Sequence, residues 1–243
     1  MLIFLFKSIK YSFFPKVQFR LIVQYMEFVG YQSWLIIALS GAMIGAIFGF
    51  QLGYIFGMFG TETLIGSASA IALSRELAPV YGAFLVTARA GSAMGAEIAT
   101  MRVNEQIDAL EVMTVNPWNY LVAPRIIASM IMLPALCALF ILCGVAASYV
   151  VAVMSLNVDK AIFLNKIAWI CTPNDIMIGL KKSAVFGALF SFIACYTGFN
   201  AKGGAEGVGR ATTKAVVVSL VLTLLVDFAL TIWVFVPDGD IIK

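Results

Sequence analysis

Residues 126–156, IIASMIMLPALCALFILCGVAASYVVAVMSL, decide the fold, because this stretch contains no charged residue and few polar ones. An α-helix needs roughly 20 apolar residues to cross the hydrocarbon core of a bilayer. Further uncharged runs cover residues 28–61 and 183–201. The sequence therefore predicts an all-α integral membrane protein.

The composition of the 243 residues supports this class. Hydrophobic residues make up 62% and charged residues 12%, whereas globular domains average about 45–50% and about 25%. A soluble fold needs more charge on its surface, and a disordered chain needs lower hydrophobicity and higher net charge. The net charge of +3 is too small and too dispersed to suggest nucleic-acid binding.

Histidine is absent, which excludes Ser-His-Asp and Cys-His catalysis and any histidine-ligated metal site. The four cysteines contain no C-x-x-C pair, and three of them lie in apolar stretches. They are interpreted as small buried hydrophobes.

The positions of the charges predict five spanning helices, over residues 34–59, 67–98, 126–156, 175–199 and 215–236. Residues 1–30 alternate basic and aromatic side chains, which is typical of an amphipathic helix lying in the membrane interface. With the N-terminus inside, basic residues on the inner side outnumber those on the outer side. The inner group is Lys7, Lys10, Lys16, Arg20, Arg102, Arg125, Lys202, Arg210 and Lys214; the outer group is Lys160, Lys166 and Lys243.

The first span carries a glycine at every fourth position, and this spacing forms a groove that another helix can approach closely. The glycines are Gly41, Gly45, Gly49, Gly53 and Gly57. One interpretation is helix packing within the chain. The other is a dimer interface or a seam that opens during transport.

Charges at membrane depth are costly, and they usually face the protein interior or a wet cavity. Arg75 and Glu76 enter the second span shortly before Pro79, which bends a helix. Asp175 and Lys182 are seven residues apart and share a face of the fourth span, and Asp227 lies within the fifth. These groups either pair to fix helix positions or line a polar pathway.

The segment 98–113 is expected to form a short amphipathic helix on the inner side, ending before Asn116-Pro117. Its acidic stripe is Glu105, Asp108 and Glu111, and its apolar face is Met101, Val103, Ile107, Leu110 and Met113. It is either a solvated linker or a docking helix for a soluble partner.

Several motifs resemble the MlaE-type permeases, the membrane subunits of ABC transporters that move phospholipids between the inner and outer membranes of bacteria. The motifs are SRELAPV (74–80), ARAGSAMGAE (88–97), MRVNEQIDAL (101–110), Asn116-Pro117, Pro124-Arg125, KSAVF (182–186), GVGRATT (207–213) and VDFAL (226–230). They occur in order along essentially the whole chain. The resemblance therefore implies a single permease domain over residues 1–243. Plastid lipid importers contain a similar subunit.

The resemblance implies a homodimer in the bacterial inner membrane, with a cytoplasmic ATPase subunit on each protomer and a ring of MCE-domain proteins outside. It makes 98–113 the coupling helix, with Arg102, Glu105, Asp108 and Glu111 as candidate contacts to the ATPase. Candidates for the lipid pathway are Gln51, Ile55, Phe56, Phe59, Arg75 and Glu76, and Asp175, Lys182 and Asp227 match the family's other intramembrane charges.

The chain contains no G-x-x-x-x-G-K-[ST] motif, so ATP and Mg²⁺ are expected to bind to the separate ATPase. The chain itself is expected to be no enzyme and to hold no cofactor. The competing hypothesis is a stand-alone secondary transporter that uses intramembrane carboxylates. Against it, the sequence shows no internal inverted repeat.

Overall fold

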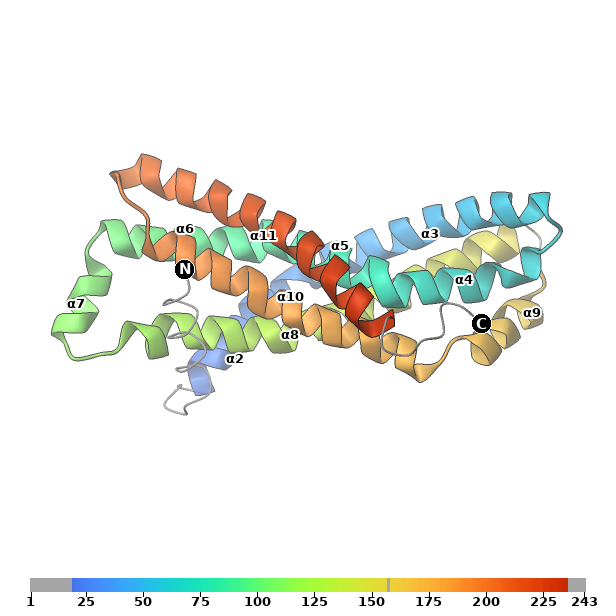
Figure 1. Cartoon of the computed structure of the whole chain (residues 1–243), viewed down its shortest axis with the longest axis horizontal. Helices are drawn as coiled ribbons and strands as arrows, with labels where there is room; N and C mark the ends of the chain where they lie inside the picture. The colour runs from blue at the N-terminus through green and yellow to red at the C-terminus, as the bar shows by residue number, and fades with distance from the viewer. Residues whose placement is uncertain (1–18, 157, 236–243) are drawn as a thin grey trace. The chain divides into compact units, whose positions relative to one another are not determined.

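The computed structural model describes residues 19–156 and 158–235, and within them every regular element is a helix (Figure 1). The prediction of an all-α membrane protein is confirmed. By its internal contacts the chain divides into two compact units. The described residues of one belong to Met1–Tyr31, Ala83–Leu133 and Ala184–Lys243, and those of the other to Gln32–Gly82 and Pro134–Ser183. We call these the first and the second unit.

Among the residues that the structure describes, four helical stretches are long and apolar enough to cross a membrane: Phe19–Met58, Trp118–Met154, Pro173–Phe199 and Gly204–Trp233. They contain α3 (Trp34–Met58), α8 (Ala123–Met154), α10 (Pro173–Phe199) and α11 (Gly204–Phe235), close to four of the expected spans. Helix α11 begins well before the expected residue 215. Its first turns are polar and carry an ion pair between Glu206 and Arg210, four residues apart on one face.

The expected second span is helical but irregular. It consists of α4 (Ile65–Ala72), the π-helical turn η3 (Leu73–Leu77), α5 (Ala78–Val86), a second π-helical turn η4 (Thr87–Gly91) and α6 (Ser92–Val103). Each of these two π turns contains charged residues: Arg75 and Glu76 in η3, and Arg89 in η4. Such wide turns occur frequently at functional sites. The crossing of a bilayer by this segment stays a prediction.

Helix α2 (Phe19–Val29) is the described part of the expected interfacial segment, and residues 1–18 lie outside the described residues. The guanidinium group of Arg89 donates a hydrogen bond to the carbonyl of Phe28 and lies 4.7 Å from the centre of the Phe28 ring. A cation of η4 thus satisfies a carbonyl at the C-terminal end of α2, where backbone acceptors lack helical partners.

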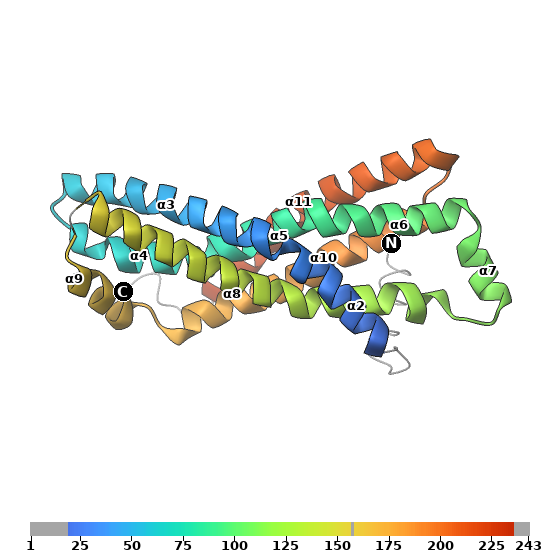
Figure 2. The same cartoon turned by 180° about the vertical axis from the view of Figure 1, so that it is seen from behind.

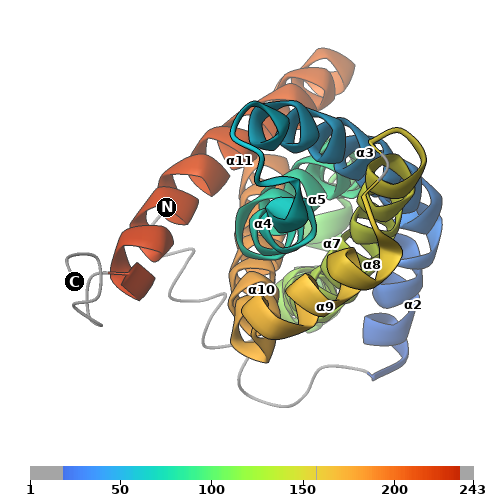
Figure 3. The same ribbon diagram turned by 90° about the vertical axis from the view of Figure 1, so that its right-hand side faces the viewer.

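In the second unit, α3 packs along residues 134–154 of α8 (Figure 2). Figure 3 shows α4 nearly end-on between α3 and α9 (Lys160–Ile170), and it contacts both of them. Ile65 of α4 and Phe163 of α9 are buried in a cluster with Ala152 and Val158. This cluster holds the short helix α9 against the longer ones.

In the first unit, α6 lies beside α11 (Figure 1). Small residues permit the contact, since a Cβ added at Gly95 would lie 3.3 Å from the Cβ of Ala215. A larger apolar cluster joins Ile98 of α6, Leu121 of η5 (Trp118–Val122) and Ile193 of α10.

Candidate functional site

Two ion pairs join η3 to α10 in the second unit. Nε of Arg75 donates to a carboxylate oxygen of Asp175 at 2.6 Å, and Nζ of Lys182 donates to a carboxylate oxygen of Glu76 at 2.7 Å. Asp175 and Lys182 therefore share a face of α10, as expected, but each pairs with a residue of η3. We call these four residues the charged cluster.

The start of α10 positions Asp175. Thr172 precedes the helix and Pro173 opens it, where its missing N–H removes no helical bond. The second oxygen of Asp175 accepts hydrogen bonds from the backbone N–H of Thr172 at 2.7 Å and from its hydroxyl at 2.9 Å. This is the carboxylate half of a capping box. Asp175 thus fixes the first turn of α10 and the position of Arg75 together.

Gly179 allows η3 and α10 to approach. It lies between Asp175 and Lys182 on the same face of α10, and a Cβ added there would fall 2.0 Å from the backbone oxygen of Ser74. Any side chain at this position would separate the two elements. The glycine therefore sets the distance that both ion pairs need.

Each pair joins a buried member on α10 to a partly exposed member on η3. The side chains of Asp175 and Lys182 are 2% and 4% exposed, whereas those of Arg75 and Glu76 are 29% and 39% exposed. The buried members fix the helices, because an unpaired buried charge costs about 3–5 kcal/mol. The exposed members leave one cation and one carboxylate accessible from the surface of η3.

The expected lipid-pathway residues of α3 differ in exposure. Gln51, Ile55 and Phe59 are exposed, whereas Phe56 is partly buried and packs against the cluster around Ile65 and Phe163. Their side of α3 also exposes Met43, Ile47, Phe50, Tyr54 and Met58. Asp227 is partly exposed within α11, in the first unit.

The glycine groove of α3 is filled by the same chain. Gly41, Gly45, Gly49 and Gly53 are buried, and added Cβ atoms would meet Phe140, Gly144, Ser148 and Leu156 respectively. At Gly57 the nearest atom is a carboxylate oxygen of Glu62 at 3.5 Å. Gly41, Gly45 and Gly49 thus serve contact with α8, Gly53 serves contact with Leu156 just beyond it, and all four are buried within the chain.

Arg125 is a site residue that the sequence argument missed. It was counted among the basic residues of the inner side, but its side chain is fully buried in the first unit. Nη2 lies 2.8 Å from a carboxylate oxygen of Glu97, Nη1 donates to the carbonyl of Leu121 at 2.7 Å, and the guanidinium lies 4.4 Å from the centre of the Tyr25 ring. The sequence does contain a signal for this pair, because Arg125 and Glu97 are opposite charges that each lie beside an apolar run, within the motifs Pro124-Arg125 and ARAGSAMGAE (88–97).

The expected helix over 98–113 is two helices. Helix α6 ends at Val103, Glu105 has a left-handed backbone with φ of 58°, and α7 (Gln106–Val112) follows. Asp108 of α7 pairs with Arg102 of α6, and Ile107 is buried in the large cluster of the first unit. Glu105, Glu111, Val112 and Met113 are exposed. The acidic residues therefore project from an elbow and do not form a straight stripe.

Apolar helices, with ion pairs buried among them, define a multi-pass α-helical membrane protein. Residues 22–233 match the model of the family described as Permease MlaE. The chain belongs to the MlaE permease family, and the resemblance seen in its motifs is confirmed.

Relatives are similar along most of their length. A probable ABC transporter permease from Rickettsia conorii is 38% identical over 229 residues, which cover 94% of this chain and 88% of the relative. One from Synechocystis is 38% identical over 225 residues, covering 93% and 86%. The chloroplastic protein Trigalactosyldiacylglycerol 1 of Arabidopsis thaliana is 38% identical over 228 residues, covering 94% and 65%. These relatives support an ABC transporter permease, and none of the three is named as an enzyme.

Proposed function

We propose that this chain is the membrane subunit of an ABC transporter that moves phospholipids between the inner and outer membranes of a bacterium and so maintains outer-membrane lipid asymmetry. The name of the Arabidopsis relative contains that of a glycerolipid, trigalactosyldiacylglycerol. This supports a lipid as the substrate. Two copies form the lipid pathway in the inner membrane, with the N-terminus in the cytoplasm. A separate ATPase binds ATP and Mg²⁺, and an MCE-domain protein receives or delivers lipid on the outer side.

The observation that carries the proposal is that the second unit exposes both a long apolar surface, on α3, and a small charged surface, on η3. Helix α3 exposes apolar side chains along its whole length, including Leu39, Ile47 and Tyr54. The turn η3 exposes part of Arg75 and Glu76. A phospholipid needs an apolar wall for its acyl chains and a few polar groups for its headgroup. Gln51, Ile55 and Phe59 therefore remain pathway candidates. Phe56 supports this part of α3 by packing against the cluster around Ile65 and Phe163.

The homodimer requires an apolar surface that the chain does not cover itself. The glycine groove is filled by α8, so it does not serve this purpose. Helix α11 exposes a second long apolar surface, made up of Val217, Val221, Leu224, Leu225, Phe228, Ile232 and Trp233. In the proposed dimer, this surface of α11 is available for contact with the second protomer.

The α6–α7 elbow is the proposed coupling element. Burial of Ile107 attaches α7 to its unit, while Glu105, Glu111, Val112 and Met113 remain exposed for contact with a partner. An exposed apolar pair beside carboxylates suits a groove with an apolar floor and a basic rim.

Copurification and reconstitution test the proposal together. The tagged chain should bring down an untagged ATPase and an MCE-domain protein. The assembled complex in liposomes should move fluorescently labelled phospholipid to acceptor membranes only with ATP, and an ATPase with its Walker A lysine replaced should abolish transfer. Transport by the chain alone, without ATP, would contradict the proposal and favour the secondary transporter.

A further inference from the structure

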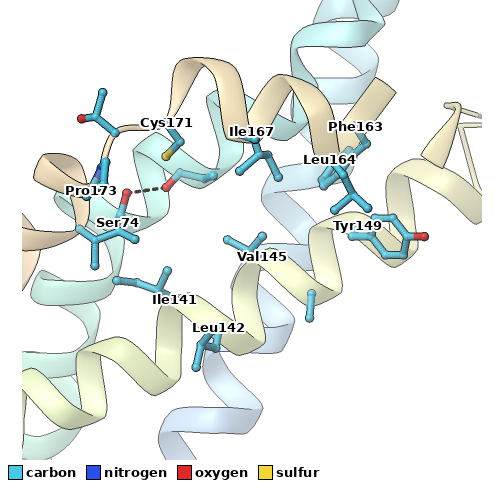
Figure 4. Close-up of a pocket in the computed structure, with 15 residues that line it drawn as sticks. Ser74, Ile141, Leu142, Val145, Tyr149, Phe163, Leu164, Ile167, Cys171 and Pro173 are labelled. Atoms are coloured by element: carbon cyan, nitrogen blue, oxygen red, sulfur yellow. Dashed lines mark hydrogen bonds between the residues drawn. The ribbon is translucent and has the colours of Figure 1, made fainter. Parts of the chain in front are cut away.

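The second unit contains a pocket of about 540 Å³ between α8 and α9. Figure 4 shows Ile141, Leu142 and Val145 of α8 along one side and Leu164, Ile167 and Cys171 along the other. Ser74 and Pro173 close one end, and Tyr149 and Phe163 lie at the other, with their ring centres 5.4 Å apart. This volume falls within the roughly 300–1,000 Å³ of small-molecule sites. We call it the α8–α9 pocket.

Most of the wall is aliphatic or aromatic, and the hydroxyl groups of Ser74 and Thr172 already have partners. The hydroxyl of Ser74 donates to the carbonyl of Ala70 at 2.6 Å, and that of Thr172 donates to Asp175 at 2.9 Å. Because a polar ligand would have to break these bonds, the wall favours an apolar ligand.

The two faces of α9 locate the pocket relative to the bilayer. Its pocket side includes Leu164, Ile167 and Cys171, and the opposite side carries Asn165, Lys166 and Trp169. Lys166 lies 5.3 Å from the Trp169 ring centre, and Trp169 is 80% exposed. Tryptophan and lysine together are typical of the membrane–water interface. An 11-residue helix is about 16 Å long, too short to span, so α9 covers the pocket at the depth where acyl chains begin.

The pocket opens through apolar side chains. Leu142 is 69% exposed and Leu164 is 57% exposed, and both belong to its lining. In a membrane these residues contact lipid, so a chain can enter sideways from the bilayer. A spanning helix of a partner protein fits less well. One helical turn with its side chains fills roughly 500 Å³, so the pocket has room for about one turn and not for the several turns of a spanning helix.

We propose that the α8–α9 pocket binds one acyl chain of a bilayer phospholipid within a single protomer. The site is formed mainly by α8 and α9, with Ser74 and Pro173 at one end, and it includes none of the α3 residues proposed for the transport pathway. A bound chain packs α9 onto α8 and so supports Thr172 and Asp175, which directly follow α9. This binding needs no ATPase and no transport.

Photocrosslinking of the purified full-length chain tests the site. The chain is placed in nanodiscs of phosphatidylethanolamine and phosphatidylglycerol that contain a phospholipid with a diazirine on its acyl chain, and labelled residues are mapped by mass spectrometry. We expect labelling concentrated on Leu142, Leu164 and Ile167. Ala168→Trp fills the pocket and should remove this labelling, whereas Ala161→Trp, at an exposed position of α9 outside the lining, should preserve it.

Protection of Cys171 provides a second measurement that leaves the pocket unaltered. Burial, reinforced by Asp175 nearby, raises the pKa of the Cys171 thiol above its ordinary value, so alkylation is run at alkaline pH, where more thiolate forms. In a bulky steroid detergent, added phospholipid should slow the alkylation of Cys171. The rate at Cys143, which is part of α8 but not of the lining, should not change.

Two outcomes would overturn the proposal. One is equal labelling of all exposed apolar faces together with identical patterns in Ala168→Trp and Ala161→Trp. The other is protection of Cys171 by an added partner protein and not by phospholipid, since the occupant would then be a protein segment. Neither outcome depends on ATP-driven transfer, so failure of this site and failure of the proposed transport function are distinguishable.

Discussion

Nε of Arg75 lies 2.6 Å from one carboxylate oxygen of Asp175, while the other oxygen of Asp175 accepts the N–H of Thr172. One side chain therefore both caps α10 and connects it to η3, more than 90 residues earlier in the chain. Helix capping and interhelical pairing are usually separate contributions to stability. Here they depend on the same carboxylate, so a change at Asp175 affects both.

Asp175→Asn should destabilise the protein by about 1–3 kcal/mol, because it removes the charge-assisted hydrogen bond with Arg75, whose side chain is 29% exposed. Asp159→Asn is the matched control, since Asp159 caps α9 through the N–H groups of Ala161 and Ile162 and asparagine caps nearly as well. Thermal unfolding in detergent should show a large loss for the first variant and little change for the second. Equal losses would mean that the ion pair contributes nothing.

Glu76→Gln should remove the ion pair that Glu76 makes with the ammonium group of Lys182, which is 4% exposed. Lys182→Met should cost less in the Glu76→Gln background than in the wild type. A double-mutant cycle measured by unfolding should give a coupling free energy of about 0.5–3 kcal/mol. Additive losses would contradict the pairing.

Arg125→Met should cost about 1–3 kcal/mol, because the carbonyl of Leu121 loses a donor and Glu97, which is 50% exposed, loses this ion pair. Arg125→Lys should recover part of this stability, since it retains the charge but not the planar group stacked near Tyr25. Scanning fluorimetry of both variants should rank them in that order. The same Tm for methionine and lysine would argue that only volume matters at this position.

Gly45→Ala should destabilise the α3–α8 contact by about 1–3 kcal/mol, because the added Cβ would lie 2.0 Å from the backbone oxygen of Gly144. Gly57→Ala serves as the control on the same helix, since its Cβ would lie 3.5 Å from the nearest side-chain atom. It should be neutral or stabilise by up to about 1 kcal/mol. The difference in Tm between the two variants is the quantity to measure.

Glu105→Lys combined with Glu111→Lys should reduce copurification of the ATPase while leaving membrane insertion intact. Both side chains are exposed on the α6–α7 elbow, so charge reversal changes the surface and not the buried contact of Ile107. Asp108→Lys should also lower stability, because it breaks the pair with Arg102. Unchanged copurification in the double variant would remove the coupling role from this surface.

The uncharged runs in the sequence were sufficient to place α3, α8 and α10, because the need to bury apolar residues in lipid dominates their positions. Helix α11 begins earlier because its polar first turns pack on α6 through small residues, Ala99 against Ala211, and hydropathy does not detect such contacts. Helix α9 escaped prediction since its 11 residues mix Lys160, Lys166 and apolar side chains.

Only part of the charged cluster could be predicted from the sequence. Spacing placed Asp175 and Lys182 on one face of α10, but pairing with Arg75 and Glu76 depends on the π turn η3 and on the gap at Gly179. The elbow at Glu105 requires a left-handed backbone at a residue other than glycine, which residue preferences disfavour. The burial of Arg125 was not evident from the sequence, because a cation beside an apolar run resembles a loop cation until its partner is known.

The backbone contact between Gly45 and Gly144 has a mechanical consequence. Where two helices meet without intervening side chains, no deformable side-chain layer separates their backbones. Sliding α3 along α8 would therefore bring backbone atoms into collision. The two helices should therefore move as one stiff lever. A conformational cycle would have to take up its motion elsewhere, at wider turns such as η3.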